Sequence, residues 1–219
     1  MTIFNAFVDF IWPPKCLICD NSLENGEKFI CDECEKAVIL FSPVDSRFRR
    51  NDAFSRKFII GSYENSLREA IHQFKYNKRI ALRKYFSVLI NDYIERNNVL
   101  DKVDIIIPVP LFPTKKRERG FNQSELLANE IDKKWNLAVS SKNLYRARHT
   151  EPQNKLNYSQ RKRNIKGAFR LKNKNSVKGK SVLLVDDIVT TGATVNECSK
   201  VLKKDGKVKN VLVLSLAGK

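Results

Sequence analysis

One segment near the carboxyl end of this 219-residue chain, residues 182–194, constrains its fold more than any other. It begins with four apolar residues, continues with Asp186 and Asp187, and ends in the polar run 190–194. A continuous apolar run is typical of a strand that is buried on both faces, and the residues after it predict a tight loop that opens a helix. Such a unit is typical of α/β proteins with a largely parallel sheet.

The same segment predicts a binding site. A parallel strand delivers both carboxylates to the edge of the sheet where α/β proteins bind ligands. The loop then gathers backbone N–H groups and threonine hydroxyls at a helix N-terminus, which suits a phosphate monoester. Gly192 lets the backbone approach the ligand closely. We expect Asp186 and Asp187 to lie about one sugar away from the phosphate, where they can accept hydrogen bonds from ribose hydroxyls.

The rest of the chain also alternates between apolar strands and amphipathic helices. Strands are expected at residues 58–63, 103–107, 144–148, 167–171, 181–185 and 211–216. Helices are expected at residues 66–74, 81–94, 122–135 and 194–204, and a short apolar helix face at 4–11. Residues 150–166 are polar and basic, and we expect them to form a long loop. The fold class is therefore α/β, with a mainly parallel sheet covered on both faces.

Four of the five cysteines predict a metal site. They form two C-x2-C pairs separated by eleven residues: Cys16, Cys19, Cys31 and Cys34. Four thiolates make the closed tetrahedral shell of a structural zinc ion, and Asn25-Gly26 favours a hairpin turn between the pairs. We expect a zinc-ribbon-like knuckle that needs its metal to fold, with two disulfides or an iron–sulfur cluster as alternatives. Cys198, in a predicted helix, is expected to be a small buried residue.

These features divide the chain into an N-terminal helix with the knuckle, residues 1–45, and a larger domain, residues 58–219. No stretch reaches the ~20 apolar residues that a membrane span needs. The N-terminus lacks the basic region and cleavage site of a signal peptide, which predicts a cytoplasmic protein.

The chain is strongly basic, and the excess is concentrated in one region. Lys and Arg exceed Asp and Glu by 41 to 24, for a net charge of +17. Residues 142–180 contain thirteen of these cations and a single acid, Glu151. Such a run favours a polyanionic partner or phosphorylated ligands, and a solvated basic surface is the alternative.

Residues 182–194 resemble the phosphoribosyl-pyrophosphate (PRPP) signature of type I phosphoribosyltransferases, in which two acids bind the ribose hydroxyls and the loop binds the 5′-phosphate. This resemblance implies a PRPP site formed by Asp186, Asp187, Thr190, Thr191, Gly192, Ala193 and Thr194. It also implies that the turn after residue 107 holds pyrophosphate and Mg²⁺ and that residues 150–166 close over PRPP. The candidates for the pyrophosphate and Mg²⁺ are Pro108, Val109, Pro110, Arg117, Arg119, Arg161 and Arg163.

Further segments resemble the competence protein F (ComF) family. They are residues 108–111, 117–124, 161–164 and 167–169, the four-cysteine knuckle, Arg146, Arg148, Thr150 and Gln153, and Tyr63, Ile71, Lys75 and Tyr76. The resemblance covers nearly the whole chain. It implies a zinc knuckle fused to a phosphoribosyltransferase-like domain that is associated in bacteria with the uptake of transforming DNA.

One departure affects the expected chemistry. Several purine-converting phosphoribosyltransferases carry an acid, which serves as general base, at the position of Thr190. Loss of such a group removes proton transfer, often worth a factor of ~10²–10⁴, and leaves the phosphate loop intact. PRPP binding is therefore better supported than base transfer, and no catalytic residue is assigned.

Three functions remain open. The first is a PRPP-binding protein of DNA uptake whose basic surface binds single-stranded DNA and which contacts proteins of the uptake machinery. The DNA-binding candidates are Arg146, Arg148, Lys155, Tyr158, Arg161, Lys162 and Arg163. The second is an active phosphoribosyltransferase with an unidentified base or amine as acceptor. The third is a PRPP-sensing regulator, although the chain shows no recognisable helix-turn-helix.

Overall fold

The computed structural model describes residues 13–24, 26–41, 52–151 and 157–218, and of Tyr158 only the backbone. The predicted helix face at residues 4–11 lies outside these ranges, as do Asn25, Gln153 and Lys155. None of the described helices is long and apolar enough to cross a bilayer.

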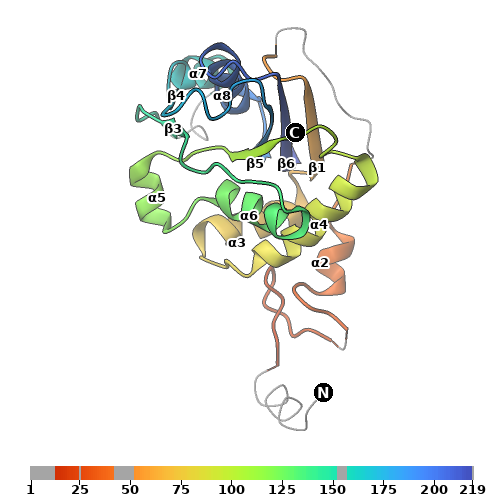
Figure 1. Cartoon of the computed structure of the whole chain (residues 1–219). Coiled ribbons are helices and arrows are strands. Elements are labelled where there is room, and N and C mark those ends of the chain that lie inside the picture. The colour runs from red at the N-terminus through yellow and green to blue at the C-terminus, as the bar shows by residue number, and fades with distance from the viewer. Residues whose placement is uncertain (1–12, 25, 42–51, 152–156, 219) are drawn as a thin grey trace.

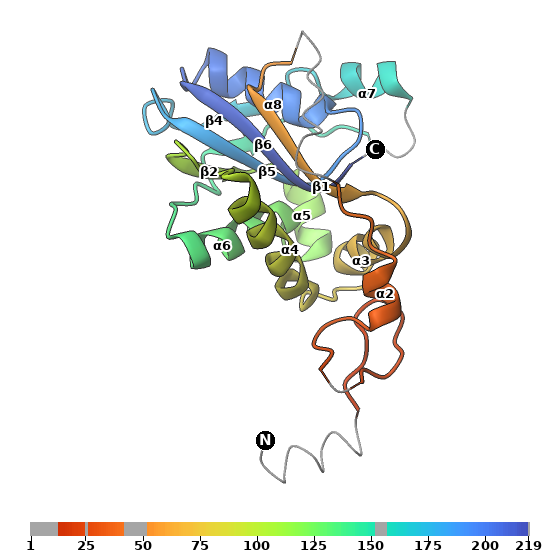
Figure 2. The same cartoon turned by 90° about the vertical axis from the view of Figure 1, so that its right-hand side faces the viewer.

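Four parallel strands form the central sheet, in the order β1-β6-β5-β2 (Figures 1 and 2). They are β1 (Arg56–Ser62), β2 (Ile105–Pro108), β5 (Ser181–Val189) and β6 (Asn210–Gly218). The two central strands are apolar along most of their length because both of their faces are covered. The predicted α/β class and parallel sheet are confirmed.

Helices lie on both faces of the sheet, as Figure 2 shows most clearly. One face is covered by α3 (Asn65–Tyr76), α4 (Leu82–Asn97) and α6 (Gln123–Trp135), and the other by α8 (Ala193–Lys204). The helix α7 (Tyr158–Ile165) packs against α8. Side chains of a strand alternate between faces. Leu183 and Val185 therefore pack in the core under the first group of helices, whereas Val182 and Leu184 pack in the core under α8.

Two predictions about the small elements need correction. The short strands β3 (Leu144–Arg146) and β4 (Phe169–Leu171) exist, but they pair with each other in a separate antiparallel sheet. Residues 150–166 are not one long loop, because they include α7. Asn157 and Gln160 form a capping box at the start of this helix, which fixes its first turn without an apolar face.

A further helix, α5 (Pro113–Arg119), was not predicted. It follows the turn after β2, and Pro113 occupies its first turn, where the missing N–H of proline costs no hydrogen bond. The helix has no buried residue, so the sequence contains no apolar periodicity that would reveal it.

The four-cysteine knuckle packs directly against the larger domain. Its second cysteine pair lies at the start of α2 (Asp32–Lys36), where Cys31 is the N-cap residue. Cys16, Ile18 and Ile30 share one buried core with the residues of α3 and α4. Arg79, just after α3, donates to both carboxylate oxygens of Asp20, at 2.7 and 2.6 Å.

Candidate functional site

A cavity of about 630 Å³ opens at the carboxyl ends of β2 and β5. Asp186 and Asp187 of β5 line it together with the turn after β2, with Thr190 of the loop after β5, and with Thr194 in the first turn of α8. This is the edge at which parallel α/β sheets bind ligands. The cavity therefore brings together the paired acids, the threonine loop and the turn of residues 109–112.

The strand that carries the acids is longer than predicted. β5 continues to Val189, so that Asp186 and Asp187 lie within the strand and not immediately after it. Neighbouring residues of a strand point in different directions, and the two carboxyl groups consequently have different partners.

Asp186 contacts α6. Its Oδ1 accepts a hydrogen bond from the Ser124 hydroxyl, at 3.0 Å, and another from the backbone N–H of Asp187, at 2.9 Å. Burial and the neighbouring charge of Asp187 raise the pKa of Asp186 to about 7, against the opposing effects of Lys75 and of these two hydrogen bonds. The Asp186 carboxyl group can therefore gain or lose a proton near neutral pH.

Asp187 contacts α3. Its Oδ2 lies 2.8 Å from the Lys75 ammonium, and both side chains are largely buried. Lys75 also lines the cavity, so the ion pair forms part of its wall. The family resemblance includes both residues, but the sequence did not indicate that they pair, because they belong to elements that are far apart in the chain.

The loop after β5 has the geometry of an anion site. Gly192 is the N-cap residue of α8 and has a φ of 73°, a left-handed conformation that glycine adopts without strain. In the part of the chain that is described, the backbone N–H groups of Thr191 and Gly192 donate to no protein atom. The Thr190 hydroxyl accepts from Arg161 of α7 at 3.1 Å, which places a guanidinium group beside the loop.

A second arginine lines the cavity from β3. Arg146 donates from Nη2 to the Thr150 hydroxyl, and its buried Nε has no partner. Burial lowers the pKa of Arg146. The charge of Asp186 opposes this shift, but no described carboxylate lies close enough to form an ion pair with the guanidinium. A half-buried cation without an ion-pair partner favours an anionic ligand.

Comparisons with known proteins agree with this geometry. The family model of the phosphoribosyl transferase domain matches residues 116–217. The chain is 29% identical over 222 residues to Competence protein F of Haemophilus influenzae, covering 93% of this chain and 96% of that protein. It is 32% identical over 195 residues to the DNA utilization protein YhgH of Shigella flexneri, covering 87% of this chain and 85% of that protein. The chain belongs to the competence protein F family.

A more distant family member is Competence protein ComFC of Bacillus subtilis, which is 26% identical over 209 residues, covering 92% of this chain and 82% of that protein. Among solved structures, the adenine phosphoribosyltransferase of Saccharomyces cerevisiae is 13% identical, with a TM-score of 0.42 over 84% of this chain and 86% of that one. The match of residues 116–217 to the domain model shows that this member of the competence protein F family contains a phosphoribosyltransferase-like domain.

Only some of the residues that were predicted to hold pyrophosphate and Mg²⁺ line the cavity. Val109, Pro110, Arg119 and Arg161 line the cavity of this competence protein F family member. The other three are not among its lining residues: Pro108 is buried at the end of β2, Arg117 is exposed on α5, and Arg163 is exposed on α7.

The residues that were predicted to contact DNA also lie in different environments. Arg146 lies in the cavity wall, and Arg161 contacts Thr190 in the loop after β5. Arg148 donates from Nη2 to the backbone carbonyls of Asn164 and Lys166, at 2.8 and 2.9 Å. Lys162 and Arg163 are exposed on α7. Lys155 and the Tyr158 side chain lie outside what the structure describes.

Two cavity residues of the competence protein F segment 117–124 have roles that the sequence did not reveal. Ser124 binds Asp186, and Gln123 accepts a hydrogen bond from Arg119 at 2.5 Å. Asn122, at the start of α6, makes no side-chain capping bond. Its amide instead donates to the Val109 carbonyl at 3.0 Å, which ties α6 to the turn after β2.

The four knuckle cysteines come together as predicted. Their Sγ atoms all lie within 4.8 Å of one another, and Cys19 and Cys31 are 3.6 Å apart. A tetrahedral zinc ion with Zn–S bonds of ~2.3 Å requires S–S separations of about 3.8 Å, so the cluster fits such an ion. All five cysteines are unpaired thiols, and Cys198 is fully buried, as expected.

Proposed function

We propose that this chain binds PRPP with Mg²⁺ and acts in the handling of DNA that bacteria take up. The observation that supports PRPP most strongly is that two carboxyl groups line one cavity together with Thr190 and Thr194. The free N–H groups of Thr191 and Gly192 line a small pocket that shares Asp186, Thr190 and Thr194 with this cavity. The loop of residues 190–194 would bind the 5′-phosphate through its N–H groups and hydroxyls. Asp186 and Asp187 would accept hydrogen bonds from the ribose.

The diphosphate of PRPP then extends toward the turn after β2. Arg119 and Arg161 supply positive charge to this cavity, and Arg146 adds a half-buried guanidinium that forms no ion pair with a described residue. Mg²⁺ commonly binds through substrate phosphates with one or two carboxylates, so it would enter together with PRPP. The knuckle cysteines would hold zinc in a structural role, since four protein ligands leave no open position.

The proposed role in DNA uptake rests on the names of the relatives, which include Competence protein F and DNA utilization protein YhgH. Exposed Lys162 and Arg163 on α7 support a surface for single-stranded DNA, which binds to basic grooves through its phosphates. Because α7 also contributes Arg161 to the phosphate loop, this surface adjoins the PRPP cavity.

Calorimetric titration with Mg²⁺-PRPP tests the ligand. The wild type is expected to bind PRPP, and Asp186→Asn to bind it at least ~10-fold more weakly, because a carboxylate accepts hydrogen bonds more strongly than an amide. Lys200→Gln, an exposed change elsewhere on α8, is the matched control and should bind like the wild type. No binding by the wild type, or equal binding by Asp186→Asn, would contradict the proposal.

Binding of a single-stranded oligonucleotide at several salt concentrations tests the DNA surface. Reversing the charges of Lys162 and Arg163 to Glu should weaken binding and reduce its dependence on salt, because fewer counterions are released. Lys84→Glu, an exposed lysine of α4, serves as the control. If both variants lose affinity equally, the binding is a general effect of net charge and α7 is not the site.

A further inference from the structure

A buried hydroxyl group of the larger domain has no partner. Tyr85 of α4 is 4% exposed, and its phenol oxygen forms no hydrogen bond with any described residue. A buried polar group without a partner costs free energy, and native proteins retain few of them. Tyr85 packs in the same buried core as Cys16 and Cys34 of the knuckle. The four-cysteine site is therefore a candidate for the partner of this hydroxyl.

The electrostatics of Tyr85 indicate that its hydroxyl lies near the second cysteine pair. Burial raises the pKa of Tyr85, and the negative charges of Glu35 and Cys34 raise it further. The phenol therefore keeps its proton and is a hydrogen-bond donor close to anionic groups. Glu35 is exposed on α2, whereas Cys34 is 8% exposed. Of these two acceptors, only the sulfur of Cys34 is buried together with the phenol.

The sulfur atoms of the knuckle differ in the hydrogen bonds that they receive. The Sγ atom of Cys16 accepts from the backbone N–H of Ile18 at 3.4 Å. No backbone N–H of the described residues donates to the Sγ atom of Cys34. Four thiolates bring more negative charge than one Zn²⁺ neutralises, so hydrogen bonds to the sulfurs stabilise such a site. A zinc-bound Cys34 consequently lacks a donor, which Tyr85 can supply.

Arg79 holds the first cysteine pair from a position just after α3. Its Nη1 donates to the Cys16 carbonyl at 3.3 Å, and its Nη2 donates to both carboxylate oxygens of Asp20. The same carbonyl accepts from the backbone N–H of Asp20 at 3.1 Å, which closes the turn that carries Cys16 and Cys19. The larger domain thus reaches both halves of the knuckle.

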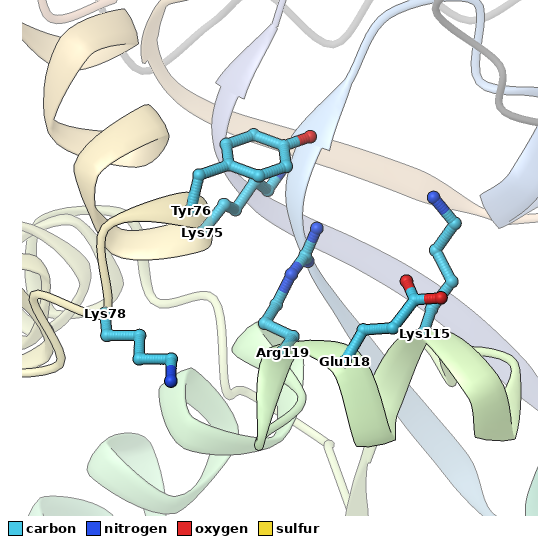
Figure 3. Close-up of a pocket in the computed structure, with 6 residues that line it drawn as sticks. All are labelled: Lys75, Tyr76, Lys78, Lys115, Glu118 and Arg119. Carbon is cyan, nitrogen blue, oxygen red and sulfur yellow. The ribbon is translucent and has the colours of Figure 1, made fainter.

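The end of α3 also belongs to the wall of the larger cavity. Lys75 and Tyr76 line this cavity, and Figure 3 shows both at the end of the helix, with Arg119 of α5 extending toward Tyr76. Arg79 follows this helix end directly along the chain. One short segment, residues 75–79, therefore contacts both the knuckle and the cavity.

We propose that the larger domain completes the metal site of the knuckle. With zinc bound, Tyr85 donates its hydroxyl to the Cys34 thiolate, and Arg79 stabilises the turn that carries Cys16 and Cys19. Neither residue binds the metal, so each acts by positioning or stabilising a ligand. The proposal rests on the zinc ion of the proposed function and is independent of PRPP.

The zinc affinity of the full chain, measured by competition with a chelator, tests the role of Tyr85. Tyr85→Phe removes only the hydroxyl and should bind zinc roughly 10-fold more weakly, the lower end of the effect of losing such a hydrogen-bond partner. Tyr93→Phe, the same change in a half-buried tyrosine of α4, should bind zinc like the wild type. Equal zinc affinities of Tyr85→Phe and the wild type would overturn the proposal.

Two further measurements separate this role from simple packing. With Co²⁺ in place of zinc, Tyr85→Phe should move the thiolate-to-metal charge-transfer band to lower energy, because a thiolate without the hydrogen bond donates electrons more strongly. Without metal, urea should unfold Tyr85→Phe and the wild type alike, since the phenol then loses no partner. An unmoved band, or an equal loss of stability with and without metal, would show that Tyr85 only packs.

Arg79→Gln tests the second contact. It removes the bonds to Cys16 and Asp20 and should also weaken zinc binding roughly 10-fold. Arg83→Gln, which removes an arginine of α4 that pairs with Glu130, is the matched control and should keep the wild-type zinc affinity. Equal zinc affinities of these two variants would contradict the role of Arg79.

The outcomes distinguish this inference from the proposed function. A wild type that binds no zinc would refute the proposed metal, and the inference with it. A wild type that binds zinc, with Tyr85→Phe and Arg79→Gln unchanged, would refute the inference alone.

Discussion

Lys75 of α3 forms a largely buried ion pair with Asp187 of β5, with 2.8 Å between Nζ and Oδ2 and side chains that are 15% and 10% exposed. This contact gives Asp186 and Asp187, the two acids of β5, different electrostatic environments. Asp187 has a cationic partner, whereas Asp186 is held by a hydroxyl and an amide. The ion pair also joins α3, the helix next to the four-cysteine knuckle, to the wall of the cavity.

Removing Lys75 is expected to destabilise the fold. Lys75→Met leaves the Asp187 carboxylate without its counter-charge, and breaking one side of a buried pair typically costs about 3 kcal/mol. The free energy of unfolding, measured with urea, should fall by this amount. Lys75→Met/Asp187→Asn removes both charges and should recover most of the loss. A double variant that is no more stable than Lys75→Met would show that the pair does not act through charge.

The stability of the protein should depend on the protonation of Asp186. Its pKa is about 7 in the folded state and about 4 in an unfolded chain, so the folded state holds the proton more tightly. The contribution of this group is therefore largest at low pH and is lost as the pH rises from about 4 to about 7. Asp186→Asn keeps a neutral side chain at every pH.

Comparison of this variant with the wild type measures the effect. The stability of Asp186→Asn relative to the wild type should be greater at pH 8 than at pH 5, because only the wild type acquires a buried charge over this range. Urea unfolding at the two pH values provides the measurement. A difference that does not change with pH would mean that Asp186 titrates at its ordinary value.

Loss of the knuckle metal should unfold the knuckle and loosen its contacts with α3 and α4. Purified protein is expected to contain one zinc ion per chain, and Cys34→Ser should lose it, because thiolate is a far better zinc ligand than a hydroxyl. Metal analysis and proteolysis within residues 13–41 are the measurements. Cys198→Ser, which changes a buried cysteine outside the cluster, should keep its zinc. A Cys34→Ser protein with full zinc content would refute the assignment.

Arg161 should contribute to ligand binding from α7. Its guanidinium contacts the Thr190 hydroxyl at 3.1 Å, so Arg161→Gln should weaken the binding of ribose 5-phosphate by roughly 10-fold, the value of a charge-assisted hydrogen bond. Calorimetry with ribose 5-phosphate provides the measurement. Lys162→Gln, the exposed neighbour, is the control. Equal affinities for these two variants would place α7 outside the binding site.

The central strand, the tight loop that opens α8 and the cysteine cluster could be predicted because each has a local pattern. Residues 182–185 are apolar without interruption, Gly192 follows within one loop, and the cysteines recur at zinc-ligand spacing. These patterns arise from burial on both faces, from backbone conformation and from metal geometry, all of which act over a few residues.

The remaining features depend on contacts between distant segments or on helices without an apolar face. Lys75 and Ser124 reach the two acids from other elements. Both belong to segments that carry the family resemblance, but no local pattern indicates which residue each one contacts. α5 buries none of its residues, and α7 depends on a polar capping box. A prediction based on apolar periodicity misses both helices, although they place Arg119 and Arg161 at the cavity.

The amide signals of the loop test the central claim most directly. In ¹⁵N-labelled protein titrated with Mg²⁺-PRPP, the largest shifts are expected at the backbone N–H groups of residues 190–194, with smaller ones at Asp186 and Asp187. This result would place the 5′-phosphate on the amides of the loop and the ribose on the acids. Shifts confined to the basic surface of α7, with the loop signals unmoved, would contradict the account.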